Sequence, residues 1–135
     1  MTLNNGRGIG VARVILGAPC LLLSISAWAH HGNAGYDMRR MTVIQKATIT
    51  EVEWGNPHCQ IHFDATDERG NVKHWIVEAP PPADLAERTW TRKALNAGDE
   101  VTVYLHAAKN GVPVGIIQRV ILPSGNILRA YPDPK

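Results

Sequence analysis

The sequence predicts a mainly β fold: a small OB-like barrel of five to six strands, with one short helix between the third and fourth strands. Three observations predict it. Apolar and polar residues alternate in short runs after residue 41, turn residues separate the runs, and the order is three strands, a helix and two or three strands. A β-sandwich is the alternative. The 135 residues leave room for one such domain, and 44% hydrophobic residues suffice for its core.

The first strand is predicted over residues 42–54. Ala47 and Ile49 lie on one side of this strand. Val52 and Trp54 lie on the other, so the buried side changes partway along. A bulge or a sharp bend would explain the change.

The second and third strands are predicted to form a hairpin. Residues 58–66 follow a break at Gly55-Asn56-Pro57, and their alternation places four apolar side chains on the core face: Cys59, Ile61, Phe63 and Ala65. Turn residues at 67–71 lead into a third strand over residues 72–78.

One helix and two or three strands complete the predicted domain. Residues 83–95 are the one helical stretch, short or broken at Thr91, with five side chains available for burial: Leu85, Ala86, Trp90, Ala94 and Leu95. The fourth strand is predicted over residues 100–107 and the fifth over 114–122, and a last short pairing reaches Leu128.

The first 29 residues are predicted to be an export signal. Arg7 and Arg13 precede a short apolar run, and Ala27-Trp28-Ala29 is typical of a signal-peptidase site. The run is too short to span a bilayer, so no stable membrane anchor is expected after cleavage. We therefore expect a periplasmic or secreted protein, divided into a signal peptide (1–29), an N-terminal arm (30–41), an OB-like barrel (42–130) and a C-terminal tail (131–135).

The charge balance argues against nucleic acid as a partner. The chain has 14 Lys and Arg against 12 Asp and Glu, and Arg7 and Arg13 belong to the predicted signal. The mature domain is then electrically balanced, with no basic excess to displace counterions from a phosphate backbone.

Cys59 is the one cysteine of the predicted mature chain, so no internal disulfide is expected. Its place on the apolar face of a strand predicts a buried, unreactive thiol.

The strongest chemical signal is the pair His30 and His31 at the predicted mature N-terminus. An N-terminal histidine offers a metal its α-amine and its ring nitrogen. One further imidazole completes a three-nitrogen plane that suits copper(II), an arrangement called a histidine brace. His31 could instead bind through the amine and the intervening backbone nitrogen, and the pair could equally form a polar tail.

Among the other histidines, His58 is the preferred third nitrogen, because it lies at a corner between two strands. Its alternative role is to hydrogen-bond the backbone of that corner. His62 faces the same way, but about 13 Å of extended chain separates the two, too far to share an ion. His106 could meet His58 at one rim of the barrel. His74 is predicted to face solvent as a cross-strand neighbour of Asp64.

The sequence lacks the common catalytic motifs. It has no G-x-S-x-G, H-E-x-x-H, Walker, G-x-G-x-x-G or C-x-x-C pattern, and no pair of acidic residues stands out as a glycosidase pair. A binding role is therefore favoured over an enzymatic one.

The chain resembles a family of small, exported bacterial proteins known as a domain of unknown function. The matching features are His30-His31, Tyr36-Asp37, the Trp-x-Asn-Pro-His motif within residues 53–58, Trp90-Thr91 with Leu95 and Gly98-Asp99, and residues 110–115. Members typically begin His-His-Ser-Phe, whereas Gly32 and Asn33 follow the pair here. The resemblance implies an exported β-rich domain in which His30, His31 and His58 act together.

These observations favour metal binding, with copper as the preferred ion and His30, His31, His58 and His106 as candidate ligands. One alternative is a metal-free OB-like interaction module that binds another protein of the cell envelope. A less favoured alternative is a histidine-brace copper oxidase.

Overall fold

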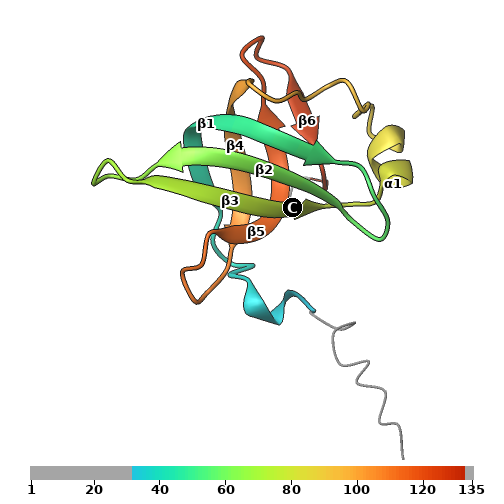
Figure 1. Cartoon of the computed structure of the whole chain (residues 1–135). Coiled ribbons are helices and arrows are strands. Elements are labelled where there is room, and N and C mark those ends of the chain that lie inside the picture. Colours follow the sequence, from blue (N-terminus) through green and yellow to red (C-terminus); the bar gives the residue numbers. More distant parts are fainter. Residues whose placement is uncertain (1–31, 133–135) are drawn as a thin grey trace, which may run out of the picture. The chain divides into compact units, whose positions relative to one another are not determined.

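The structure, a computed structural model, describes residues 32–132. It confirms the predicted mainly β fold: a closed five-stranded barrel with one extra strand, and a short helix between the third and fourth strands (Figure 1). The elements in chain order are η1 (Asn33–Gly35), β1 (Thr42–Glu53), β2 (Cys59–Thr66), β3 (Val72–Ala79), α1 (Pro82–Glu87), β4 (Glu100–Ala107), β5 (Val114–Ile121) and β6 (Ile127–Arg129).

A single sheet closes on itself to make the barrel. Its strand order is β3-β2-β1-β4-β5-β6, and a parallel pairing of β3 with β5 joins its two sides. β5 pairs with β4 along one edge. Along its other edge, residues 114–116 pair with β3 and residues 119–121 pair with β6. The β3–β5 pairing closes the barrel over Ile76, Val77 and Glu78 of β3.

β1 bends as its alternation predicted. The pairing with β4 shifts between Ile44 and Ala47, and the pairing with β2 shifts between Ile49 and Glu51. Lys46, inside the first shift, has a φ of 54°. These two bulges let one strand pair with β4 at its beginning and with β2 at its end.

The β2–β3 hairpin also has its predicted form. The strands pair from Cys59 opposite Ala79 to Thr66 opposite Val72. In the turn, the backbone N–H groups of Arg69 and Asn71 each donate a 2.9 Å hydrogen bond to Oδ1 of Asp67. The four side chains predicted for the core face of β2 are all buried.

The helix is shorter than the stretch predicted for it. Helix α1 ends at Glu87, because Thr89 has a φ of 64°, in the left-handed region. The backbone N–H groups of Arg88 and Trp90 both donate hydrogen bonds to the carbonyl of Leu85. A separate turn follows at Thr91, as expected. Leu85, Trp90 and Leu95 are buried in the core, but Ala86 is exposed, since the chain leaves the helix before a second apolar side can form.

The N-terminal arm lies against the end of β4. Tyr36 forms an isolated bridge with Ala108, and the N–H of Asp37 donates to the carbonyl of Ala107 at 2.9 Å. The N–H of Lys109 donates to the carbonyl of Gly35. The segment before β1 is therefore part of the domain.

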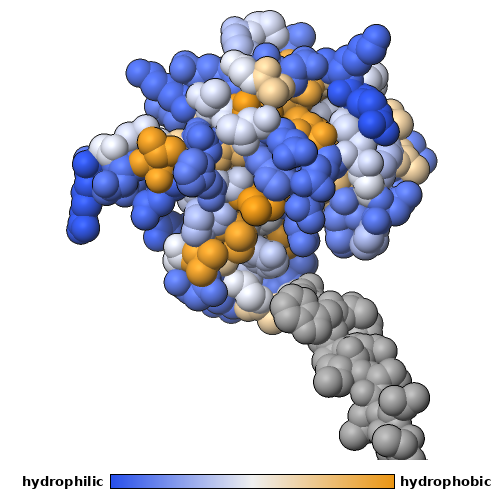
Figure 2. Space-filling model, viewed as in Figure 1, coloured by the Kyte–Doolittle hydropathy of each residue, from blue (hydrophilic) through white to orange (hydrophobic). Residues whose placement is uncertain are grey.

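Apolar side chains also reach the surface, in patches interrupted by hydrophilic residues (Figure 2). The most exposed large ones include Val72, Ile76 and Val112, at 40–55%. No helix within residues 32–132 has the length and apolar character needed to cross a bilayer.

Candidate metal centre

The outer face of β1, β2 and β3 is acidic. Strand pairing places its outward side chains in three rows: Glu53, Gln60 and Glu78; Glu51, His62 and Ile76; and Thr48, Asp64 and His74. Residues that are paired across a sheet point to the same side. These nine positions hold four carboxylates and two imidazoles, and no Lys or Arg.

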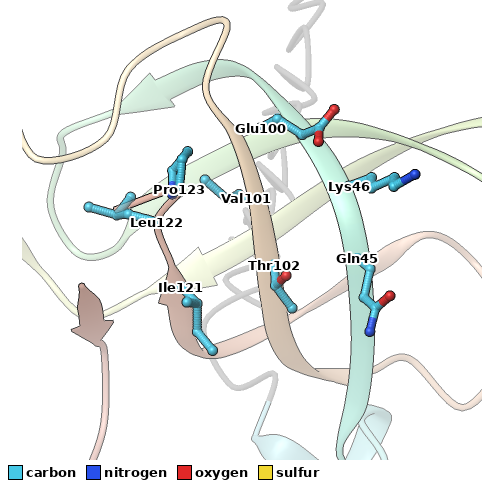
Figure 3. A pocket seen from close by; sticks show the side chains of 8 residues that line it. All are labelled: Gln45, Lys46, Glu100, Val101, Thr102, Ile121, Leu122 and Pro123. Carbon is cyan, nitrogen blue, oxygen red and sulfur yellow. The ribbon is translucent and has the colours of Figure 1, made fainter. Parts of the chain in front are cut away.

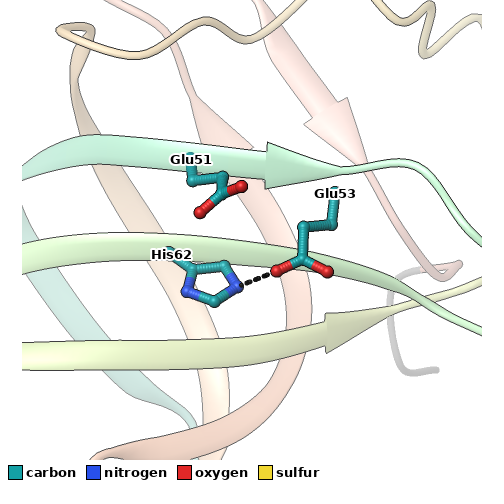
Figure 4. Close-up of side chains that lie close together, drawn as sticks. All are labelled: Glu51, Glu53 and His62. Carbon is teal, nitrogen blue, oxygen red and sulfur yellow. Dashed lines mark ion pairs between the residues drawn. The ribbon is translucent and has the colours of Figure 1, made fainter.

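Three of these side chains converge. One donor atom from each of Glu51, Glu53 and His62 lies within 4.8 Å of the others (Figure 4). Nε2 of His62 is 2.9 Å from Oε1 of Glu53, and the His62 side chain is 22% exposed against 52% for Glu53. We call this set the Glu51–Glu53–His62 group.

The ring of His62 has a partner within the group. Its buried Nε2 lies at ion-pair distance, 2.9 Å, from Oε1 of Glu53, although the contact does not have hydrogen-bond geometry. The group therefore brings one imidazole nitrogen and two carboxylates within 4.8 Å of one another.

The chemistry of this donor set suits a divalent metal. An imidazole nitrogen and carboxylate oxygens are common zinc ligands, and catalytic zinc sites in proteins often use three such groups. Imidazole also suits copper, iron and nickel, whereas carboxylates suit manganese, magnesium and calcium. One nitrogen with two oxygens therefore favours an ion of intermediate character such as zinc.

His58 lies in the corner between β1 and β2, as predicted, and its side chain is exposed. The corner contains a cis peptide bond between Asn56 and Pro57. His58 shares a hollow of about 370 Å³ with seven other residues, among them Glu53, Gln60 and Glu78. Its imidazole has no hydrogen bond or ion pair with any residue of the described chain.

His106 has different surroundings. Its Nδ1 lies 3.2 Å from the carbonyl oxygens of Asp37 and Arg40, on the N-terminal arm. A donor at Nδ1 leaves Nε2 as the free ring nitrogen, which is the usual arrangement of a metal-binding histidine.

The structure does not bring His58 and His106 together. The strand pairing separates the two histidines. His106 on β4 is opposite Ile116 on β5, and Ile116 is opposite Glu78 on β3. Glu78 is opposite Gln60 on β2, two residues after His58. Three strand spacings of about 4.8 Å make a path of about 14 Å over the barrel. His30 and His31 lie outside the described residues.

His74 and Cys59 have the surroundings that the sequence predicts. His74 is opposite Asp64, with Nδ1 2.6 Å from Oδ1, and its side chain is 79% exposed. Cys59 is a free, buried cysteine, and burial raises the pKa of its thiol. A thiol in this state is a weak nucleophile.

Another hollow, of about 220 Å³, lies where β1, β4 and the end of β5 meet (Figure 3). Lys46 and Glu100 are its two charged residues, and the remaining lining is polar or apolar. The lysine and the glutamate balance each other, so this hollow has no net charge. It contains one carboxylate and no histidine or cysteine, so it offers no set of metal ligands.

Sequence reasoning missed the Glu51–Glu53–His62 group. The alternation of Glu51, Glu53 and His62 shows that each faces outward, but their convergence depends on the register of β1 against β2. The bulge at the end of β1 sets that register, because it moves Glu51 opposite His62. The sequence signal for this group was two outward glutamates, Glu51 and Glu53, before the corner and an outward histidine, His62, after it.

Fold and site together define a small closed β-barrel with a candidate metal-binding group on its outer face. The chain belongs to a family of unknown function, DUF6152, which matches residues 20–118. A search of curated proteins found no match.

Proposed function

We propose that this protein is an exported metal-binding β-barrel protein and that Glu51, Glu53 and His62 hold a divalent ion. The convergence of their three donor atoms within 4.8 Å carries the proposal. Two neighbouring carboxylates repel each other, and the attraction of each to a bound cation outweighs that repulsion. The burial of His62 Nε2 beside the Glu53 carboxylate supports the same interpretation.

Zinc is the ion that best fits this donor set, and the ion stays accessible from outside. The side chains of Glu51 and Glu53 are exposed, so three protein ligands leave further coordination positions to water or to a small ligand. Such a site suits storage or transfer of an ion, because exposed ligands exchange readily.

Copper(II) is proposed for a separate position at the mature N-terminus, formed by His30 and His31. We prefer His106 to His58 as the added imidazole there. His106 contacts the arm a few residues after His31, and its Nδ1 is already engaged by arm carbonyls. His58 faces the acidic side of the barrel instead.

Calorimetric titration with zinc tests the site. The chain should carry His30→Ala and His31→Ala so that the N-terminus does not compete. We expect Glu51→Gln and His62→Ala each to weaken the tightest zinc binding at least about 10-fold. His74→Ala is the matched control, since His74 lies on the same face but pairs with Asp64. Equal effects of His62→Ala and His74→Ala would contradict the proposal.

Copper titration with electron paramagnetic resonance tests the N-terminal position. Protein beginning at His30 is compared with a form carrying one extra residue before it. Tight binding lost on extension, and weakened by His106→Ala, supports the proposal. If neither zinc nor copper binds, we infer a metal-free module that binds another protein of the cell envelope. Oxygen consumption by the copper-loaded protein with a reductant would instead favour a histidine-brace oxidase.

Export rests on residues 1–29 and is tested on the protein from living cells. We expect the periplasmic fraction or the medium to contain a chain that begins at His30. A chain with an intact Met1 in the cytoplasm would contradict export.

A further inference from the structure

We propose that Asn110 is a site of spontaneous deamidation in the folded protein, where the side-chain amide is lost as ammonia and a carboxylate takes its place. Asn110 lies in the loop between β4 and β5, and Gly111 follows it. Both residues are exposed. Neither belongs to a proposed metal site, so this inference stands apart from the proposed function.

The reaction needs the protein and water alone. The backbone nitrogen of Gly111 attacks Cγ of Asn110, and a new C–N bond closes a cyclic succinimide. The bond from Cγ to the side-chain nitrogen breaks, and that nitrogen leaves as ammonia with the proton of the Gly111 N–H. Water then opens the succinimide at one of its two carbonyls, which gives aspartate or isoaspartate.

The structure turns the side chain of Asn110 toward the backbone that follows it. The N–H of Val112 donates a 3.1 Å hydrogen bond to Oδ1 of Asn110. This bond holds the carboxamide against the segment that contains the Gly111 nitrogen. The same N–H stabilises the negative charge that develops on Oδ1 when the nitrogen adds to Cγ.

Gly111 offers its nitrogen without a shielding side chain. It has a φ of 79°, and nothing lies within 4 Å of a Cβ added there. Its N–H donates to the carbonyl of Ala108 at 3.2 Å, at the long end of the range for such bonds. This bond must open before the nitrogen attacks, and bonds in exposed loops open readily.

The other asparagines of residues 32–132 lack a following glycine. Each precedes either a residue whose side chain shields the backbone nitrogen or a proline, which has no N–H. They are Asn33, Asn56, Asn71, Asn96 and Asn126. Two of these side chains are also held by hydrogen bonds, to Asp67 and to the carbonyl of Lys93.

The product lies where the barrel closes. The carbonyl of Pro113 accepts a bond from the N–H of Ile76, beside the β3–β5 pairing, and the N–H of Lys109 donates to the carbonyl of Gly35. Isoaspartate lengthens the main chain by one methylene between these fixed bonds. We therefore expect the isoaspartate form to unfold at a lower urea concentration than Asn110→Asp, whose backbone is normal.

Peptide mapping of the full-length protein tests the site. The folded protein is kept in warm, mildly alkaline buffer and then cut with pepsin at low pH, and mass spectrometry follows each asparagine. We expect Asn110 to deamidate at least about 10-fold faster than Asn71 and Asn126. Gly111→Ala keeps Asn110 but should slow its loss at least about 10-fold.

Gly125→Ala is the matched control for Gly111→Ala. Gly125 also has a positive φ, of 84°, and open space around an added Cβ, so this substitution should leave the rate at Asn110 unchanged. Circular dichroism verifies that both variants fold.

Three results would overturn the inference. An Asn110 amide that persists as long as those of Asn71 and Asn126 would show that the site is unreactive. Loss at Asn110 that is unchanged in Gly111→Ala would refute attack by the Gly111 nitrogen. Loss that occurs in urea but not in the folded protein would show that the folded loop prevents the reaction.

Discussion

Nε2 of His62 on β2 lies 2.9 Å from Oε1 of Glu53 on β1, although the two residues are not directly opposite in the sheet. Glu51 is the residue opposite His62, so the imidazole reaches diagonally toward Glu53 and lies near both carboxylates. Diagonal contacts of this kind are within reach of long side chains.

Zinc should stabilise the folded protein. At a free zinc concentration of 100 times Kd, one site adds about 2.7 kcal/mol to the free energy of unfolding. For a domain of this size, that raises the Tm by about 10 °C. Differential scanning calorimetry measures the shift, and a chelator should reverse it. A Tm unchanged by saturating zinc would show that the folded chain does not bind the ion.

Phe63→Ala should destabilise the barrel by about 3–5 kcal/mol. Phe63 is fully buried, and its ring stacks on Trp75 with 5.9 Å between the ring centres. Urea unfolding followed by tryptophan fluorescence measures the loss. Val72→Ala is the control, since Val72 is 55% exposed and should change stability by about 0.5 kcal/mol or less. Similar costs for the two substitutions would be incompatible with this packing.

Gly115→Ala should destabilise the barrel where β5 packs against β4. A Cβ at this position would lie 2.7 Å from Cδ1 of Leu105 and 2.9 Å from the carbonyl oxygen of His106. Crowding of this kind costs about 1–3 kcal/mol, measurable by urea unfolding. Gly35→Ala is the matched control, because nothing lies within 4 Å of its added Cβ. A neutral Gly115→Ala would contradict the tight approach of β4 to β5.

Cys59 should resist alkylation in the folded protein. Burial raises the pKa of its thiol, so the folded state favours the protonated form and the unfolded state ionises first. The stabilising contribution is complete below about pH 9, the ordinary thiol pKa, and is lost as the pH rises through the higher folded value. Protein beginning at His30, in which Cys59 is the one cysteine, is treated with iodoacetamide with and without urea. Rapid alkylation without urea would refute the burial.

Most of the barrel could be predicted from sequence because its signals are local. The alternation of β2, the turn at Asp67 and the changing side of β1 each report on a few neighbouring residues. The parallel β3–β5 pairing and the bridge from Tyr36 to Ala108 join distant segments, so no local pattern reveals them. The helix was predicted too long because the left-handed backbone at Thr89 has no signature in its residue type.

The candidate site was less accessible to sequence reasoning than the fold. His58 and His106 were chosen for their places at strand ends, and the structure shows what each faces: the hollow at the β1–β2 corner for His58 and the arm carbonyls for His106. The Glu51–Glu53–His62 group depends on a one-residue shift in pairing between β1 and β2. The alternation of β1 indicates a bulge, but it does not say which residue of β2 then lies opposite Glu51.

Anomalous diffraction at the zinc edge, from crystals grown with zinc, shows directly which side chains hold the ion. We expect an anomalous peak about 2.0–2.2 Å from a ring nitrogen of His62 and from carboxylate oxygens of Glu51 and Glu53. A well-ordered barrel with these three side chains unliganded, and with zinc bound elsewhere or absent, would contradict it.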